Sequence, residues 1–399
     1  KPLASSRLGQ IIALQQRTLS QKPAVLQRTD RLAKYFVERL LIIAAATFVL
    51  WYFWLDADRA FWVTLSVLVA TCPCALSLAT PTAITCALAR LNRNGILIKN
   101  AQVLDVLPEL THIVFDKTGT LTEGRFSISD IKLFSSDYSE AQALNLIANL
   151  EAYSEHPIGR AFADKLTTKL PLEQVNIVVG SGISAQFNSR QIKVGSAAFC
   201  AVTPQAKAMV YLCTDNQLIA AVSLHDALRQ EVPALVSQLQ QQGYKLLMLT
   251  GDSSEQADKL QQQLGFDQMV KGCSPEQKVA EITALVSAGH KVLMLGDGIN
   301  DSPSFHAAHV SVAMQSGTDL SKNQADVVLL QHDIGLIATL LQGSKAAQRG
   351  IRQNLAWSVG YNLIIIPLAV AGFVSPYIAV IGMSFSSLLV VSNSLRLLK

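Results

Sequence analysis

Residues 114–122 read Val-Phe-Asp-Lys-Thr-Gly-Thr-Leu-Thr. The apolar run at 113–115 predicts a buried strand, which delivers Asp116 to the strand's carboxyl end, where open α/β sheets place their ligand chemistry. A carboxylate followed by a lysine, threonine hydroxyls and a glycine that allows close backbone approach is suited to attack a phosphoryl group and hold its oxygens. We therefore interpret Asp116 as a candidate nucleophile.

The sequence around this stretch predicts an α/β fold with a doubly wound parallel sheet. Short apolar strands at 246–249 and 292–295 are each followed by a polar helical pattern. Residues 125–224 form an insert that is large enough to be an α+β domain of its own. Its expected helices lie near 139–150 and 157–169, and its expected strands near 175–179, 183–187, 191–194, 209–213 and 218–222.

The composition places part of the chain in a lipid bilayer. The chain is 50% hydrophobic with a mean hydropathy of +0.30, which is too apolar for an ordinary soluble enzyme. Apolar stretches at 35–55 and 60–89, and a third at 354–398 that residues 372–376 divide, predict four transmembrane helices. Basic residues flank them on the side of the soluble part, which predicts a multi-pass cell-membrane protein with its catalytic domains in the cytoplasm. The net charge of +4 without a basic stripe argues against nucleic acid as a partner.

Six segments follow from these patterns, with the soluble part between the second and third spans. They are a polar leading helix (1–34), two spans (35–99), the first part of the parallel sheet (100–124), the insert (125–224), the second part of the sheet (225–345) and two closing spans (346–399).

Four short polar pieces, distant in sequence, are expected at one edge of the sheet. They carry Asp116, Thr250, Lys278 and the pair Asp297 and Asp301. In a phosphoryl-transfer site Asp116 would attack, Thr250 would hydrogen-bond the transferred group and Lys278 would neutralise its charge. The pair of aspartates would hold Mg²⁺ through hard carboxylate oxygens.

The order of these pieces resembles the phosphorylation domain of P-type ATPases, whose fold is similar to that of the haloacid dehalogenases. The resemblance covers essentially the whole chain and implies that Asp116 becomes an aspartyl phosphate at the expense of ATP. The catalytic residues that it implies are Asp116, Lys117, Thr118, Thr250, Gly251, Asp252 and Lys278. The magnesium ligands that it implies are Asp116, Thr118, Asp297 and Asp301.

Under this resemblance the insert is the nucleotide-binding domain. Its Ser-Glu-His-Pro run resembles the His-Pro motif of the heavy-metal class. A neutral imidazole can orient adenine or phosphate, and glycines let the backbone reach a nucleotide. The residues expected to bind ATP are Glu151, His156, Gly180, Gly182 and Gly195.

The spans suggest a metal path for a soft ion. Cys72 and Cys74 flank a proline that would kink the second span and turn two sulfurs to one side. Together with Tyr361-Asn362, Met383 and Ser387, they resemble the pattern of the monovalent-copper subgroup. Sulfur ligands favour Cu⁺, and no charged residue lies at 354–394 where a divalent site would place a carboxylate. The expected cargo is Cu⁺, with Ag⁺ undecided, and a copper chaperone is an expected partner.

Two features leave alternatives open. Residues 61–107 resemble the copper pumps linked to cytochrome oxidase maturation in bacteria (the FixI or CcoI type), but nothing in the site separates these from efflux pumps. The sequence contains no Thr-Gly-Glu, the loop of the family's actuator domain, and has four predicted spans where the class has eight. We therefore expect an amino-terminally truncated core, in which residues 1–34 are the tail of the actuator domain and a linker helix. The alternatives are a membrane-tethered dehalogenase-fold phosphatase and a metal-binding fragment that does not turn over.

Overall fold

The computed structural model describes residues 24–398 apart from 71–73, 155–156, 179–180, 206–207, 253–254, 298–301, 318–321 and 323. The chain divides into two compact units, which are described separately. The first unit comprises 1–113, 241–244 and 279–399, and the second comprises 114–240 and 245–278.

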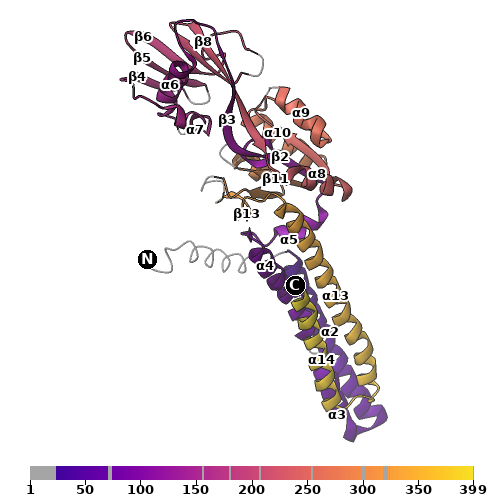
Figure 1. The fold of residues 1–399 in the computed structure, drawn as a ribbon. Coiled ribbons are helices and arrows are strands. Elements are labelled where there is room, and N and C mark those ends of the chain that lie inside the picture. The colour runs from indigo at the N-terminus through magenta and orange to yellow at the C-terminus, as the bar shows by residue number, and fades with distance from the viewer. Residues whose placement is uncertain are drawn as a thin grey trace, which may run out of the picture. The chain divides into compact units, whose positions relative to one another are not determined.

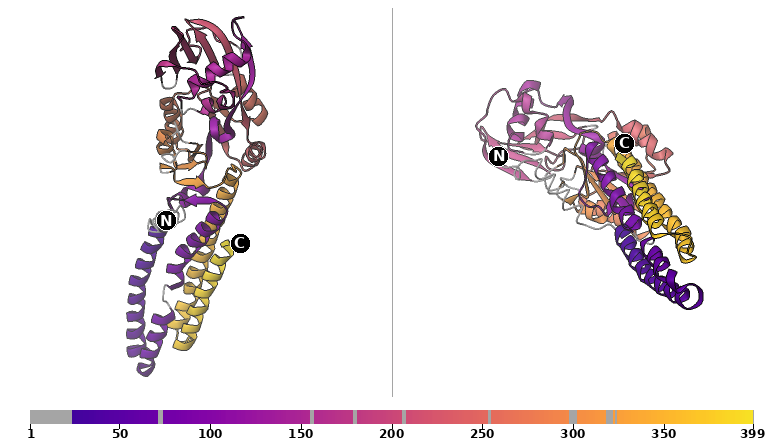
Figure 2. Two further views of the ribbon diagram at one scale, coloured as in Figure 1. Left: turned by 60° about the vertical axis from the view of Figure 1, so that its left-hand side comes forward. Right: turned by 90° about the horizontal axis from the view of Figure 1, so that it is seen from below.

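Long helices lie side by side in the first unit, where the indigo-to-purple helices run beside the yellow ones (Figure 1, Figure 2). They are α2 (Ala24–Leu50) with its continuation η2 (Trp51–Leu55), α3 (Ala57–Ala70), α4 (Cys74–Arg93), α13 (Leu336–Val370) and α14 (Pro376–Leu395), which η6 (Arg396–Leu398) follows. Small apolar side chains such as Ala44, Ala70 and Ala379 are buried between them. Large ones such as Leu363 and Phe373 are 74% and 78% exposed, as expected for a surface that faces lipid.

Three helical stretches in the described part of the chain are long and apolar enough to cross a membrane. They are Tyr35–Leu55, Ala57–Arg93, which passes over residues 71–73, and Pro376–Leu398. The sequence predicted four, and the missing one was expected to begin at Asn354. That segment lies within α13, whose apolar half is diluted by Asn354 and Asn362, so α13 is not among the three.

The first unit also holds one part of the α/β layer. Its strands are ordered β1 (Ile96–Ile98), β13 (Val327–Leu329), β12 (Val310–Ala313) and β11 (Val292–Gly296). The pairs β13–β12 and β12–β11 are parallel, and β1 joins β13 antiparallel. The short helices here are α5 (Val103–Val106), η3 (Leu107–Glu109) and α11 (Ser302–Ala307).

The second unit holds the strand that carries Asp116. β2 (His112–Asp116) enters it at Val114 and neighbours β9 (Lys245–Leu249), which pairs in parallel with β10 (Gln268–Val270). Helices α8 (Val232–Gln241), α9 (Glu255–Leu264) and α10 (Pro275–Ser287) alternate with these strands, as the sequence predicted. The rings of Phe115 and Phe266 pack edge to face in the core of this layer, with 5.8 Å between the ring centroids.

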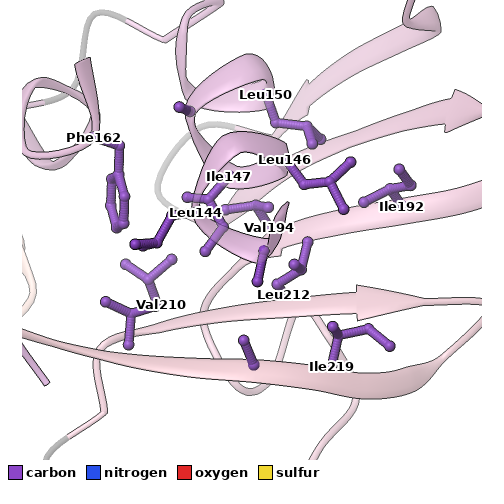
Figure 3. Packing of buried hydrophobic residues seen from close by; sticks show 14 of the residues in the cluster. Leu144, Leu146, Ile147, Leu150, Phe162, Ile192, Val194, Val210, Leu212 and Ile219 are labelled. Atoms are coloured by element: carbon purple, nitrogen blue, oxygen red, sulfur yellow. The ribbon is translucent and has the colours of Figure 1, made fainter. Parts of the chain in front are cut away.

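The insert is an antiparallel sheet in the second unit. Its strands are ordered β3 (Thr122–Leu133), β8 (Gln217–Leu228), β7 (Val210–Thr214), β6 (Arg190–Gly195), β5 (Gly182–Phe187) and β4 (Glu173–Val178). Helix α6 (Glu140–Glu151) lies over one face and buries Leu146, Ile147 and Leu150 against Val194 and Leu212 (Figure 3). A capping box between Ser139 and Gln142 fixes where α6 begins.

Two local predictions in the insert are wrong. The long strand β3 was not predicted, since most of its side chains are exposed and only Thr122 is buried. The helix predicted at 157–169 is only α7 (Pro157–Arg160) followed by η5 (Ala163–Lys165). It ends early because Oδ1 of Asn145 accepts hydrogen bonds from the backbone N–H groups of Thr167 and Thr168, which draws this segment onto α6.

Candidate functional site

A buried ion pair joins the candidate nucleophile to a distant lysine. Asp116 ends β2 with 7% exposure, and Nζ of Lys278 donates to its Oδ1 at 2.6 Å. Lys278 lies in the first turn of α10, which begins at a capping box between Ser274 and Gln277. The cap therefore determines where the helix presents Lys278, and the structure brings these two predicted residues together.

A second ion pair links the next residue to the predicted Thr-Gly-Asp turn. Nζ of Lys117 donates to Oδ2 of Asp252, and both side chains are nearly buried. The backbone N–H of Asp252 donates to Oγ1 of Thr250 at 3.0 Å. The Thr250 hydroxyl thus accepts there and keeps its own proton as a donor. Gly251 lies between them in the sequence. A Cβ built on it would lie 3.5 Å from the carbonyl oxygen of Cys273.

The loop after Asp116 is tied down by residues that sequence reasoning missed. Gly119 has φ +71°, which favours glycine, and its N–H donates to Oγ1 of Thr122. The buried guanidinium of Arg229 donates to the carbonyl oxygens of Gly119 and Thr120 at 3.0 and 2.9 Å. Asp226 accepts a hydrogen bond from the Thr122 hydroxyl. The only sequence signal for Asp226 and Arg229 is that they are charged residues at the end of an apolar strand.

The predicted magnesium ligands are only partly placed. Asp297 follows β11 in the first unit, whereas Asp116 and Thr118 belong to the second, and Asp301 lies outside the described residues. Carboxylate and hydroxyl oxygens are the hard donors that Mg²⁺ prefers, so the donor set fits this ion.

Glu151 is the clearest candidate in the insert. It ends α6 with 8% exposure, and burial raises the pKa of its carboxyl from 4.5 to about 7. A Cβ at Gly159 would lie 3.1 Å from its Oε2, so α7 packs directly against the carboxyl. His156 and Gly180 lie outside the described residues.

Gly182 and Gly195 face each other across β5 and β6. A Cβ built on Gly182 would lie 2.5 Å from Cδ1 of Phe199, and one on Gly195 would lie 3.0 Å from the same atom. The space beside both glycines is therefore filled by this chain's own strand backbone and Phe199. Close strand packing is a sufficient reason for these glycines, besides the predicted approach to a nucleotide.

Buried polar atoms without partners mark the helix bundle. Among the described residues they include the Tyr361 hydroxyl and Oδ1 of Asn362 in α13 and Oγ of Ser386 in α14. The Tyr361 hydroxyl lies against Gly382, 2.7 Å from the position of an added Cβ. Ser386 is only 1% exposed, whereas the predicted Ser387 is half-buried.

Of the three sulfur-bearing residues predicted as copper ligands, only Cys74 and Met383 lie among the described residues. Met383 is half-buried and lies one turn before Ser386 and Ser387 on α14. Cys74 begins α4 and is disulfide-bonded in this structure, while Cys72 lies outside the described residues. The described part of the chain contains no group of three or more His, Cys, Asp or Glu residues that could hold a metal ion.

Family models match the soluble part. A haloacid dehalogenase-like hydrolase model matches residues 110–309, and a second model of the same description matches 278–341.

Curated relatives match the chain over nearly its whole length. The "Cation-transporting P-type ATPase B" of Mycobacterium tuberculosis is 36% identical over 99% of this chain and 55% of the relative. The "Copper-exporting P-type ATPase" of Bacillus subtilis is 34% identical over 98% of this chain and 52% of the relative. The chain thus spans about half the length of these relatives.

Two solved structures are similar. A zinc-transporting PIB-type ATPase in the E2.Pi state has a TM-score of 0.73 and 28% identity, covering 100% of this chain and 68% of that one. The catalytic CPx-ATPase domain CopB-B has a TM-score of 0.56 and 30% identity, covering 64% of this chain and 98% of that domain.

Proposed function

We propose, since the chain belongs to the haloacid dehalogenase-like hydrolases and to the heavy-metal P-type ATPases, that its Asp116 accepts the γ-phosphoryl group of ATP and that this step drives a metal ion across a membrane. The observation that carries the proposal is the buried contact of Asp116 with Lys278, beside the pair Lys117–Asp252. An apolar surround strengthens the pull of a lysine on a nearby anion, so the pair suits a carboxylate that must accept a phosphoryl group.

The residues divide the reaction between them. An Oδ atom of Asp116 attacks the γ-phosphorus, the bond to the bridging oxygen breaks, and ADP leaves with that oxygen's electron pair. Lys278 offsets the negative charge, and the Thr250 hydroxyl donates to an oxygen of the transferred group. Asp116, Thr118, Asp297 and Asp301 would hold Mg²⁺, which would add further charge neutralisation when bound. Arg229 and Gly119 hold the loop that positions Asp116.

The insert delivers the nucleotide in this proposal. Glu151 is buried at the end of α6, beside α7 and near His156 in sequence, which makes this helix end the expected place for adenine. Gly180, Gly182 and Gly195 stay predicted parts of the pocket. For the last two, packing on Phe199 limits how closely a ligand reaches the backbone.

Cu⁺ is the cargo that we propose. The unpartnered atoms of Tyr361, Asn362 and Ser386 support a site in the bundle, because a buried polar atom without a partner is costly unless a ligand satisfies it. The remaining proposed ligands are Met383, Ser387 and the pair Cys72 and Cys74, which would bind as thiolates once the disulfide of Cys74 is reduced. Sulfur selects a soft monovalent ion, and residues 354–394 contain no Asp or Glu.

Two named relatives bear on this choice in different directions. The Bacillus subtilis relative is named for copper and the PIB-type structure for zinc. We favour copper on the ligand set. A copper chaperone as donor and a cytoplasmic position of the catalytic domains complete the proposal.

Phosphorylation of the chain tests the proposal. Membranes containing the 399-residue chain are incubated with Mg²⁺ and ATP labelled at the γ-phosphate, and acid-precipitated. We expect a label that hydroxylamine removes, as it removes acyl phosphates, and that Asp116→Asn abolishes. Asp130→Asn, which changes an exposed carboxyl on β3, is the matched control and should keep the label. A label that survives Asp116→Asn would overturn the nucleophile assignment.

A further inference from the structure

Two buried thiols lie on the insert's sheet, outside the site proposed above. Cys200 lies in the segment after β6, Cys213 lies in β7, and both are 0% exposed. They share one apolar cluster with Tyr211 and Ala221. Because side chains alternate along a strand, this cluster covers the sheet face opposite the one that Leu212 buries under α6.

The contacts hold the two sulfurs together. Sγ of Cys200 donates to the carbonyl oxygen of Tyr211 at 3.4 Å, two residues from Cys213 on the same face of β7. Sγ of Cys200 also donates to the carbonyl oxygen of Lys193 at 3.9 Å, and Lys193 is paired with Cys213 across the two strands. The closeness of the two thiols raises the pKa of Cys200 and lowers that of Cys213. Lys193, the partner of Cys213 across β6 and β7, lowers the pKa of Cys213 further through its charge. Cys213 is therefore the thiol that ionises first.

Phe199 connects this pair to the glycines of the insert. It precedes Cys200 in the chain, and its ring lies against Gly182 and Gly195. Protein interiors are close-packed, so a shift of Cys200 moves Phe199 against both strands. Phe199 thus links the cysteine pair to Gly182 and Gly195, which are predicted to line the nucleotide pocket.

We propose that Cys200 and Cys213 form a redox couple whose oxidation to a disulfide weakens nucleotide binding by the insert. The effect on binding rests on the proposed function, whereas the disulfide itself does not. Both thiols are 0% exposed, so the oxidant, a hydroperoxide such as hydrogen peroxide, reaches them when this edge of the insert opens locally. The Cys213 thiolate then attacks one oxygen, an S–O bond forms as the O–O bond breaks, and the leaving hydroxide takes up a proton. The Cys200 sulfur then displaces the hydroxyl from the sulfenic acid, and the S–S bond forms. Two thiols and one hydrogen peroxide give one disulfide and two waters.

Mass spectrometry of the full chain tests the disulfide. Lys207 lies between the two cysteines in sequence, so trypsin separates them unless they are bonded. After peroxide treatment we expect a joined pair of peptides that contains Cys200 and Cys213 and that dithiothreitol separates. Cys213→Ser should abolish it. Cys86→Ser, at another buried free cysteine, is the matched control and should leave it unchanged. Oxidation that joins neither cysteine to the other would overturn the proposal.

Calorimetric titration with ATP tests the effect on binding. The oxidised wild-type chain should bind ATP at least about fivefold more weakly than the reduced chain, because fivefold is the lower end of the usual coupling between two sites. Dithiothreitol should restore the affinity. The affinity of Cys213→Ser should not respond to peroxide. Unchanged affinity in a chain that carries the disulfide would overturn the control of binding. A reduced chain that binds no ATP would instead contradict the nucleotide assignment, and the joined peptides would still form.

Discussion

Nζ of Lys278 lies 2.6 Å from Oδ1 of Asp116, although 162 residues separate them in the sequence. Both side chains are only 9% exposed, so little solvent screens their attraction. Removing one partner of a buried pair leaves an uncompensated charge, which costs much more than the net value of the pair.

Lys278→Met is therefore expected to reduce both stability and phosphorylation. We expect a loss of about 3–5 kcal/mol in the free energy of unfolding, because the buried Asp116 carboxylate loses the cation with which it pairs. Phosphoenzyme formation should slow by about 10²–10³-fold, as when one charge-stabilising group is removed. Denaturant unfolding and rapid-quench labelling measure the two effects.

Lys245→Met is the matched control for this change. Nζ of Lys245 lies 2.7 Å from Oδ1 of Asp267, a similar distance, but the Lys245 side chain is 63% exposed. An exposed pair contributes about 0–1 kcal/mol, so neither stability nor labelling should change much. Equal losses in the two variants would contradict the special role of the Asp116–Lys278 pair.

Glu151 makes the insert less stable as the pH rises. The pKa of its carboxyl is about 7 in the folded chain against 4.5 for the ordinary group, so the unfolded chain loses this proton first. The contribution of Glu151 to the free energy of unfolding is at its full value below pH 4.5, decreases between pH 4.5 and 7, and stays low above pH 7. The shift corresponds to about 3 kcal/mol.

Hydrogen exchange of α6 amides, corrected for intrinsic rates, measures this pH effect. The decline between pH 4.5 and 7 should disappear in Glu151→Gln, which has no proton to lose. It should persist in Glu140→Gln, which changes an exposed residue at the other end of the same helix. A decline that is the same in both variants would contradict burial of Glu151 as its cause.

Gly182→Ala should destabilise the insert. Its Cβ would press on Phe199 and on the backbone of β6, and overpacking of this kind costs about 1–3 kcal/mol. Gly360→Ala is the control, since a Cβ there meets nothing within 4 Å. Thermal unfolding of the two variants gives the comparison, and a Gly182→Ala chain as stable as wild type would show that β5 and β6 separate readily.

Ser386→Ala should have opposite effects on stability and on metal binding. Without metal, the change removes a buried hydroxyl that has no partner, which should stabilise the bundle by about 1–3 kcal/mol. With Cu⁺, it removes a proposed ligand, so competition with a Cu⁺ chelator under reducing conditions should show weaker binding. Ser384→Ala, at an exposed position of the same helix, should change neither. Unaltered Cu⁺ affinity in Ser386→Ala would remove this residue from the site.

The predictions from the sequence succeeded where the signal is local. Alternating strands and helices around 246–249 and 292–295 correspond to β9 and β11, and the apolar stretch at 35–55 is helical throughout. Hydrophobic periodicity carries such signals because each element must bury one face. Three of the four predicted spans recur in the described residues, and α13 mixes polar residues into the apolar half where the fourth was expected. Strand β3 was missed because most of its side chains are exposed.

The sequence by itself determined the fold class, the expected nucleophile and the turn residues near it, because strand ends and short motifs are written in consecutive residues. Only the tertiary structure decided which charges pair. Lys278 meets Asp116, Lys117 meets Asp252, and Arg229 holds the loop between them. It also decided that Ser386, and not its neighbour, is buried, and that Phe199 fills the space beside Gly182. Such choices depend on distances between residues far apart in the chain, which no local pattern encodes.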